Sequence, residues 1–272
     1  MHLGIIGCGK MGTALVAGAI RAGVVNCADV IGCDPSPASR EAFSQATGAL
    51  ATPTPASLAA TCDVILLCTK PHDVLTAMRE IAAATATASQ PRLILSIAAG
   101  IPLTTLEAAA PAHFRLIRAM PNTPALVGKG AAAYCLGTRA TPADAATAQA
   151  LLGSVGLALE LPERLMNAVT GLSGSGPAYG YVVIEALADG GVQAGLPRAE
   201  ALRLAAQTLL GAATMVLDSN QHPAVLKDQV TSPGGTTIAG LAELERLGLR
   251  AALIAAVGAA TRRADELGGR DA

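Results

Sequence analysis

The chain has 272 residues, which suits one large domain or two of moderate size. Apolar residues make up 51% of it and aromatic residues 2%, and the formal net charge is −1, so nothing indicates binding to nucleic acid or to an anionic membrane surface. No uninterrupted apolar run reaches membrane-spanning length, and the first residues, MHLGIIGCGK, lack the pattern of a secretory signal. We therefore expect a cytoplasmic protein that does not enter a membrane.

The cysteines indicate neither disulfides nor a metal site. All six lie in the first half of the chain, none in C-x-x-C spacing, and no cluster of cysteine and histidine has the spacing of a zinc site. We interpret them as reduced, mostly buried thiols and expect no metal.

Strand and helix patterns alternate over residues 1–160. Short apolar segments predict strands at 2–7, 29–34, 63–69, 92–98, 113–121, 130–137 and 157–162. Helical spacing predicts helices at 11–23, 39–47, 72–82, 102–110 and 142–155. This order predicts an α/β fold with a parallel, doubly wound sheet.

From residue 161 onward the pattern is helical only. Helices are predicted at about 163–170, 177–189, 197–217, 236–247 and 249–267, with Pro177 and Pro197 in first-turn positions. We therefore expect two domains, 1–160 and 161–272, with no flexible linker.

A glycine-rich turn joins the first predicted strand to the first helix. Its sequence, GIIGCGKMG, places Gly7, Gly9 and Gly12 in G-x-G-x-x-G order. One glycine permits the tight turn, one lets the backbone approach a pyrophosphate, and one lets the helix pack on the strand. The alternative is a purely structural turn. We interpret the segment as a dinucleotide site, with contacts from Ile6, Gly7, Cys8, Gly9, Lys10, Met11 and Gly12.

Asp34 ends the second predicted strand, where a carboxylate usually meets the adenosine ribose. Such a carboxylate accepts hydrogen bonds from the ribose hydroxyls and repels a 2′-phosphate. No arginine is adjacent in the sequence, and the nearest, Arg40, belongs to the next helix, so we expect NADH to be accepted. The alternative is a turn cap, because DPSP also has the composition of a turn.

Three further strand ends face the same crevice in a doubly wound sheet. They carry CTKP (Cys68, Thr69, Lys70 and Pro71), SIAAG with Ala98 and Ala99, and MPNTP with Asn122. The small residues of SIAAG leave room for a flat nicotinamide ring. The alternatives are a solvated lysine at residue 70 and a rigid interdomain turn at MPNTP.

The segment DQVTSPGGTT, residues 228–237, precedes an apolar helix and carries two adjacent glycines and four hydroxyl side chains. Its residues alone permit two interpretations. It could cap the helix, as serine and threonine often do, or it could hold a small ligand.

Six segments together resemble the pyrroline-5-carboxylate reductase family: GCGKMG, CTKPH, SIAAGI, MPNTP, TGLSGSGPAYGYVVIEALADGGVQAGL and LKDQVTSPGGTTIAGL. The resemblance extends from about residue 3 to residue 267. It implies a Rossmann-like domain that binds NADPH or NADH, followed by an all-α dimerisation domain. It also implies a homodimer through interlocking C-terminal helices, an active site between the cofactor domain and the helices of the dimer, and larger rings such as a pentamer of dimers.

The reaction implied by the resemblance is hydride transfer to the imine carbon of 1-pyrroline-5-carboxylate, which gives L-proline. Thr237 matches the active-site threonine of the family, and its hydroxyl would face the ring nitrogen. The N–H groups at the start of the following helix suit the substrate carboxylate. The substrate contacts expected from the resemblance are Glu163, Gln229, Ser232, Gly234, Gly235, Thr236 and Thr237, with Ser175 as a further candidate. The chain departs from some members at Pro55, where they carry an asparagine that touches the cofactor.

Two other functions fit a chain of this layout. A β-hydroxyacid dehydrogenase would place an asparagine and a lysine one turn apart on a helix, but the position four after Asn167 is Gly171. Lys227 is the only lysine after residue 129, so a lysine acid/base is not expected. A nucleotide-sensing protein of the same fold would not need the SPGGTT segment.

Overall fold

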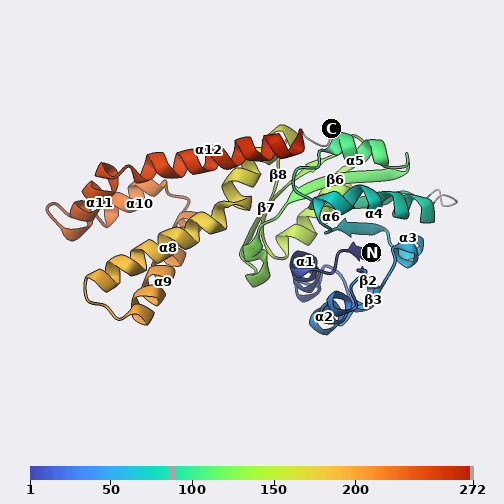
Figure 1. The fold of residues 1–272 in the computed structure, drawn as a ribbon, viewed down its shortest axis with the longest axis horizontal. Helices are drawn as coiled ribbons and strands as arrows, with labels where there is room; N and C mark the ends of the chain where they lie inside the picture. Colours follow the sequence, from blue (N-terminus) through green and yellow to red (C-terminus); the bar gives the residue numbers. More distant parts are fainter. Residues whose placement is uncertain (86–89, 270–272) are drawn as a thin grey trace. The chain divides into compact units, whose positions relative to one another are not determined.

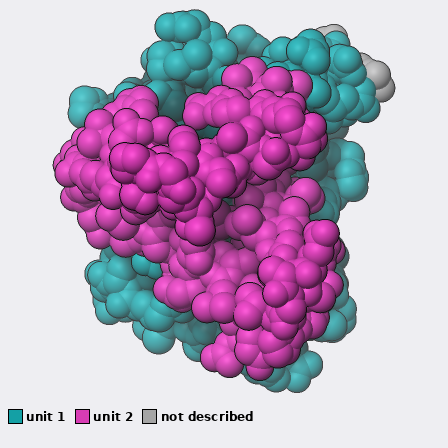
Figure 2. All heavy atoms as spheres, turned by 90° about the vertical axis from the view of Figure 1, so that its left-hand side faces the viewer, with its two compact units in different colours: residues 1–175, 258–272 teal, residues 176–257 magenta. Residues whose placement is uncertain are grey.

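The computed structural model describes residues 1–85 and 90–269 (Figure 1). The chain forms two compact units, coloured teal and magenta in Figure 2. Unit 1 comprises residues 1–175 together with 258–272, and unit 2 comprises residues 176–257. The predicted boundary near residue 160 coincides with the end of the last strand, but unit 1 continues to Ser175 and takes up the chain again at Gly258.

Unit 1 is built on one eight-stranded sheet, whose strand order is β3-β2-β1-β4-β5-β6-β7-β8. Strands β1 and β4 pair in parallel at the centre, with Ile6 opposite Leu67. The prediction of a Rossmann-like doubly wound sheet is confirmed. The strands are β1 (Leu3–Ile6), β2 (Val30–Cys33), β3 (Leu50–Thr52), β4 (Val64–Leu67), β5 (Arg92–Ser96), β6 (Phe114–Met120), β7 (Gly130–Leu136) and β8 (Gly156–Glu160).

Helices cover both faces of the sheet because successive strand residues point to opposite sides. Ile5 and Leu66 belong to one buried cluster, which also holds side chains of the helices α1, α2 and α6. Ile6 and Leu67 belong to a second cluster, which holds side chains of α3, α4 and α5. The helices of unit 1 so far are α1 (Lys10–Arg21), α2 (Pro37–Thr47), α3 (Ala56–Thr61), α4 (Pro71–Ala84), α5 (Leu103–Ala109) and α6 (Pro142–Gly153).

The sheet is mostly parallel, as predicted, but it departs from that pattern at one end. β7 pairs with β6 antiparallel, while β8 pairs with β7 in parallel, so these two strands run opposite to the rest. The reason lies in the connection. Only residues 121–129 separate β6 from β7, with the 3₁₀ turn η2 (Thr123–Val127) among them, whereas a parallel crossover needs about a dozen residues or more.

The chain passes from β8 towards unit 2 through short helical pieces. The predicted helix at 163–170 is present as η3 (Glu163–Leu165), α7 (Met166–Val169) and a π-helical turn, η4 (Thr170–Gly174). Asn122 fixes this turn, because its Nδ2 donates to the Ser173 carbonyl at 2.9 Å while its Oδ1 accepts from the Ala131 N–H at 2.8 Å.

The remaining helices agree closely with the predicted ones, apart from one that was missed. They are α8 (Gly176–Gln193), α9 (Arg198–Ser219), α10 (Pro223–Gln229), α11 (Thr236–Arg246) and α12 (Leu249–Gly268). In unit 2, α8 packs on α9 through the buried side chains of Ala188, Ala201 and Ala205, as a core of small residues requires. None of the helices in the described ranges has the length and apolar character needed to cross a membrane.

One glycine in α1 tests how tightly the helices pack in unit 1. A Cβ added to Gly18 would lie 2.1 Å from Cγ1 of Val155, a β-branched side chain with little freedom to move. We expect Gly18→Ala to lower the free energy of unfolding by about 1–3 kcal/mol because the helix must shift outward. Urea denaturation followed by circular dichroism measures the change.

Gly153→Ala is the matched control, since a Cβ there would meet its nearest described neighbour, Nε2 of Gln149, at 3.8 Å. Its unfolding free energy should stay within about 0.5 kcal/mol of wild type or rise. Equal effects from the two substitutions would contradict the packing argument.

Candidate active site

The glycine-rich turn has the geometry that its three glycines predict. Gly7 has a φ of 100°, and a Cβ there would lie 2.7 Å from the carbonyl oxygen of Cys68. A Cβ on Gly12 would lie 2.4 Å from the Gly7 carbonyl oxygen. By contrast, no described atom other than those of Gly9 and its two chain neighbours lies within 4 Å of the Cβ position of Gly9, which is the N-cap of α1. Two glycines therefore allow close packing, and the third leaves space beside a helix N-terminus.

Most of the predicted cofactor residues line one cavity of about 400 Å³ at the carboxyl ends of β1, β4 and β5. This group comprises Gly9, Lys10, Met11, Cys68, Thr69, Lys70, Pro71, Ala98 and Ala99. Thr123 of the MPNTP segment also lines it, and Ile97 and Leu126, which were not singled out from the sequence, complete the lining. A second cavity of about 640 Å³ shares Gly9, Lys10 and Leu126 with the first and extends between α1 and α2, with Cys8 in its wall. The two cavities therefore adjoin one another at these three residues.

One side chain in the first cavity suits a ligand directly. The hydroxyl oxygen of Thr69 is buried and has no hydrogen-bond partner among the described residues. A buried hydroxyl without a partner is costly, and a bound dinucleotide with its many oxygens and amide groups would satisfy it. The residues present therefore fit the expected cofactor.

Asp34 braces the glycine-rich turn. Its Oδ2 accepts from the Cys8 N–H at 3.0 Å, and its Oδ1 accepts from the Ser36 N–H at 2.9 Å. Ser36 is in turn the N-cap of α2. The two interpretations of Asp34, ribose contact and turn cap, are thus compatible, and the cap is present in the structure.

Arg40 lies nearer to Asp34 than the sequence suggested. Its Nη1 donates to the Asp34 carbonyl at 2.7 Å and to the Pro35 carbonyl at 3.0 Å. α2 begins at Pro37, so Arg40 is in its first turn and reaches back to the end of β2. The signal that could have revealed this is the Ser36-Pro37 helix start, which places residue 40 beside the strand end.

The thiols around the turn are unreactive. Burial, with the nearby Asp34 carboxylate adding to it, raises the pKa of the Cys8 thiol to about 12. Burial also raises the pKa of Cys68, whose charged form would lie close to Cys8. Both side chains stay neutral at physiological pH and serve as small apolar walls rather than as nucleophiles.

Asn122 was predicted to contact the cofactor. Both ends of its amide are bonded within unit 1, to Ser173 and Ala131, and its neighbour Thr123 lines the cavity instead. A direct contact with the cofactor stays a prediction for Asn122.

The SPGGTT segment forms the start of α11 in unit 2. Gly235 occupies the N-cap, and Thr236 and Thr237 are the first two helical residues. Gly234 has a φ of 66°, and the Gly235 N–H donates to the Ser232 carbonyl at 3.1 Å. The capping interpretation is therefore not what the structure shows, because the N-cap is a glycine and has no side chain. The first N–H groups of the helix have no partner within the helix, as at any helix start.

The other predicted substrate residues are placed differently. Gln229 ends α10, where its Nε2 donates to Oε1 of Gln221 at 3.0 Å. Ser232 is exposed. Glu163 is bonded to Arg118 and to the Leu103 N–H within unit 1. Ser175 lines a cavity in the same unit.

The sheet order, the glycine-rich turn and the two joined cavities define a dinucleotide-binding protein of the doubly wound class, with an additional helical unit. Comparison with known proteins narrows this class. The family described as NADP oxidoreductase coenzyme F420-dependent matches residues 2–100, and the family described as pyrroline-5-carboxylate reductase dimerisation matches residues 163–267.

Individual relatives match nearly the whole chain. The pyrroline-5-carboxylate reductase of Synechocystis is 47% identical over 268 residues, with 98% of each chain covered. The structure of a pyrroline-5-carboxylate reductase from Coxiella burnetii has a TM-score of 0.91 at 32% identity, again with 98% of each chain covered. A Plasmodium falciparum pyrroline carboxylate reductase with NADP bound has a TM-score of 0.85 at 32% identity and the same coverage. The chain belongs to the pyrroline-5-carboxylate reductase family, as the resemblance predicted.

The position of Arg40 leads to a prediction about cofactor choice. A guanidinium at the end of β2 can meet a 2′-phosphate, and a charged hydrogen bond of this kind contributes about 1.5–3 kcal/mol. We expect Arg40→Ala to weaken NADPH binding about 10-fold, close to the lower end of that range. NADH binding should change less than about 2-fold, since NADH lacks the phosphate. Titration of cofactor fluorescence measures both dissociation constants.

Arg79→Ala is the control, because Arg79 is an exposed arginine on α4 and its loss makes the same change in net charge. If Arg40→Ala weakens the binding of NADPH and NADH equally, Arg40 does not discriminate between the two cofactors.

Proposed function

We propose that the protein reduces 1-pyrroline-5-carboxylate to L-proline with NADPH or NADH, the last step of proline synthesis. The observation that carries the proposal is the first turn of α11, where a glycine N-cap precedes two threonines. It is supported by the adjoining cavities at the glycine-rich turn. It is also supported by the 47% identity, over nearly the full length of both chains, to a reductase of this name.

The residues of unit 1 bind and orient the cofactor. The N-terminus of α1 and the open position at Gly9 would receive the pyrophosphate. Ala98 and Ala99 would form the wall for the nicotinamide, where small side chains leave room for a flat ring. When bound, NADPH or NADH supplies the hydride. The Thr69 hydroxyl would find its missing partner there.

The residues at the start of α11 bind the substrate. The N–H groups of Gly234 and the first two threonines would hold the carboxylate, helped by the partial positive charge of the helix N-terminus. The Thr237 hydroxyl would bond to the ring nitrogen and fix the ring. If the imine arrives protonated, the hydride adds to the imine carbon and the nitrogen already holds its proton. No strong general acid is then needed, and the site acts by positioning.

We also propose a homodimer through the C-terminal helices, with a pentamer of dimers as the larger form, in the cytoplasm. The match to a dimerisation family over residues 163–267 supports an oligomer. The number of exposed large apolar side chains in unit 2 also supports it, since apolar side chains that gather on a surface often meet a partner. They include Tyr181, Val182, Leu217, Leu247 and Ile254.

The first test is a direct assay. Purified protein is mixed with 1-pyrroline-5-carboxylate and either NADH or NADPH, and cofactor absorbance and proline are followed together. Oxidation with equal formation of proline supports the proposal. A folded protein that binds cofactor but oxidises neither form would instead support the nucleotide-sensing interpretation.

Thr237 gives a sharper prediction. We expect Thr237→Val to keep the fold and cofactor binding but to lose on the order of 10²-fold in kcat, as for removal of one preorganised hydrogen-bonding group. Thr237→Ser keeps the hydroxyl and should retain most of the activity. Unchanged turnover in the valine variant would exclude Thr237 from the mechanism.

The oligomer gives another prediction. Light scattering should report a multiple of the 27.0 kDa chain, either two copies or ten. Ile254→Asp should lower the mass, because a carboxylate on an apolar contact surface is costly to bury. A monomeric wild-type protein would contradict the proposed assembly.

A further inference from the structure

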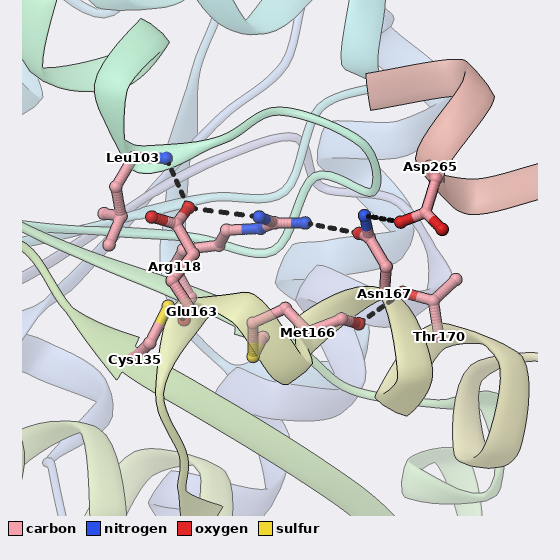
Figure 3. A network of polar contacts seen from close by, with 8 residues as sticks. All are labelled: Leu103, Arg118, Cys135, Glu163, Met166, Asn167, Thr170 and Asp265. Carbon is pink, nitrogen blue, oxygen red and sulfur yellow. Dashed lines mark hydrogen bonds and ion pairs between the residues drawn. The ribbon is translucent and has the colours of Figure 1, made fainter. Parts of the chain in front are cut away.

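A continuous polar network centred on Arg118 joins segments that are far apart in the sequence (Figure 3). Arg118 lies on β6 with a buried side chain, and its Nη1 donates to Oε1 of Glu163 at 3.1 Å. Its Nη2 donates to Oδ1 of Asn167 at 3.3 Å. The same Glu163 oxygen accepts from the Leu103 N–H at 2.7 Å, and Nδ2 of Asn167 donates to Oδ1 of Asp265 at 2.7 Å. We call these five residues the Arg118 network.

Glu163 caps the short helix α5 from a distance. Leu103 is the first residue of α5, and the N-cap, Pro102, offers no side-chain hydrogen bond. The Glu163 carboxylate takes one of the unpaired N–H groups at this helix start and places a negative charge there, which the helix dipole favours. This hydrogen bond thereby fixes the loop between β5 and α5 at the end where α5 begins.

The network joins the segments that form the walls of one cavity of about 310 Å³ in unit 1. Gly100 and Ile101 come from the loop before α5, Thr170 from the π-helical turn after Asn167, and Ala264 from α12 beside Asp265. The cavity shares Pro71 and Ala99 with the cavity proposed for the cofactor. Loss of the network would therefore loosen the wall at the nicotinamide end.

The ion pair of Arg118 with Glu163 joins a buried guanidinium to a partly exposed carboxylate, and it contributes little stability relative to a well-packed apolar pair, because the guanidinium loses water. What it supplies here is geometry. The planar guanidinium bonds to two side chains at once and sets their relative positions. The signal in the sequence was an arginine within the apolar strand HFRLIRAMP.

We propose that Arg118 and Glu163 are positioning residues, which hold the loop that carries Ala98 and Ala99 in place through Leu103 and tie it to α12 through Asn167 and Asp265. This role rests on the proposed function. In this proposal Glu163 acts by holding Leu103 and Arg118 in place, and not by the direct substrate contact expected from the resemblance.

Glu163→Gln and Asp265→Asn test the two ends of the network, since each keeps its shape and removes one charge. Glu107→Gln is the matched control. Oε1 of Glu107, on the same helix α5, accepts from the N–H and the hydroxyl of Thr138 at 2.6 and 2.9 Å, away from the cavity. Amide hydrogen exchange of the peptide that spans residues 97–106 should become about 10-fold faster in Glu163→Gln and unchanged in the control, because local opening sets this rate.

Kinetics give the second readout. We expect kcat to fall about 10-fold in Glu163→Gln, while the dissociation constant of the cofactor changes less than about 3-fold, because small misplacements of a reacting ring cost rate more than affinity. Asp265→Asn should show a smaller fall, and the double variant should lose less than the product of the two single losses, as for residues in one network.

Unchanged exchange in the 97–106 peptide, or faster exchange with unchanged kcat, would overturn the positioning role. So would a large rise in the substrate KM with unchanged exchange, which would place Glu163 on the substrate. If Glu163→Gln does not fold, Asp265→Asn at the exposed end of the network decides the question by the same two readouts. If the wild-type protein does not reduce the substrate, the proposed function fails, and hydrogen exchange still tests the network.

Discussion

The close approach of the ends of β1 and β4 is the constraint on which the cofactor site depends. The backbone at Gly7 passes so near Cys68 that residue 7 has no room for a side chain. The turn that follows directs the N-terminus of α1 into the crevice, and Gly12 lets that helix pack directly on the turn. Asp34 then fixes the turn from the neighbouring strand by accepting the Cys8 N–H. A parallel sheet, two absent side chains and one carboxylate thus shape the turn and the helix start that we propose for the pyrophosphate.

The other organising element is the end of β6. Arg118 lies within this strand, and Asn122 lies two residues beyond its last residue, Met120. Asn122 holds the π-helical turn through the Ser173 carbonyl, where the chain is about to leave unit 1. Arg118 connects through Asn167 to Asp265, on the part of α12 that belongs to unit 1 again. Both passages of the chain between the units are therefore anchored to one strand end by side-chain hydrogen bonds.

The sequence predicted the parts of the fold that depend on local pattern. Strands of four or more apolar residues and helices with clear caps were found near their expected bounds. Most of the residues predicted for the cofactor line one cavity, while their contact with a cofactor stays a prediction. Elements with weak local signals were missed. β3 has three residues at the sheet edge, and α3 is a six-residue helix, ASLAAT, with a single large apolar side chain. α10 is capped by a histidine, His222, which accepts the Ala224 N–H. The antiparallel β7 and the contacts of Arg40 and Glu163 depend on tertiary structure, which no local pattern encodes.

The division of unit 1 into two stretches of sequence has a consequence for synthesis of the protein. Residues 1–175 leave the ribosome first, but the rest of the unit, from Gly258 onward, arrives only after the whole of unit 2 has been made. Until then the sheet can form, but Asn167 has not yet bonded to Asp265, and the cavity of about 310 Å³ lacks the wall that α12 supplies. A nascent chain stalled within unit 2 would hold a nearly complete nucleotide fold with one side open. Completion of unit 1 therefore has to follow the synthesis of unit 2, although the sheet itself is encoded before it.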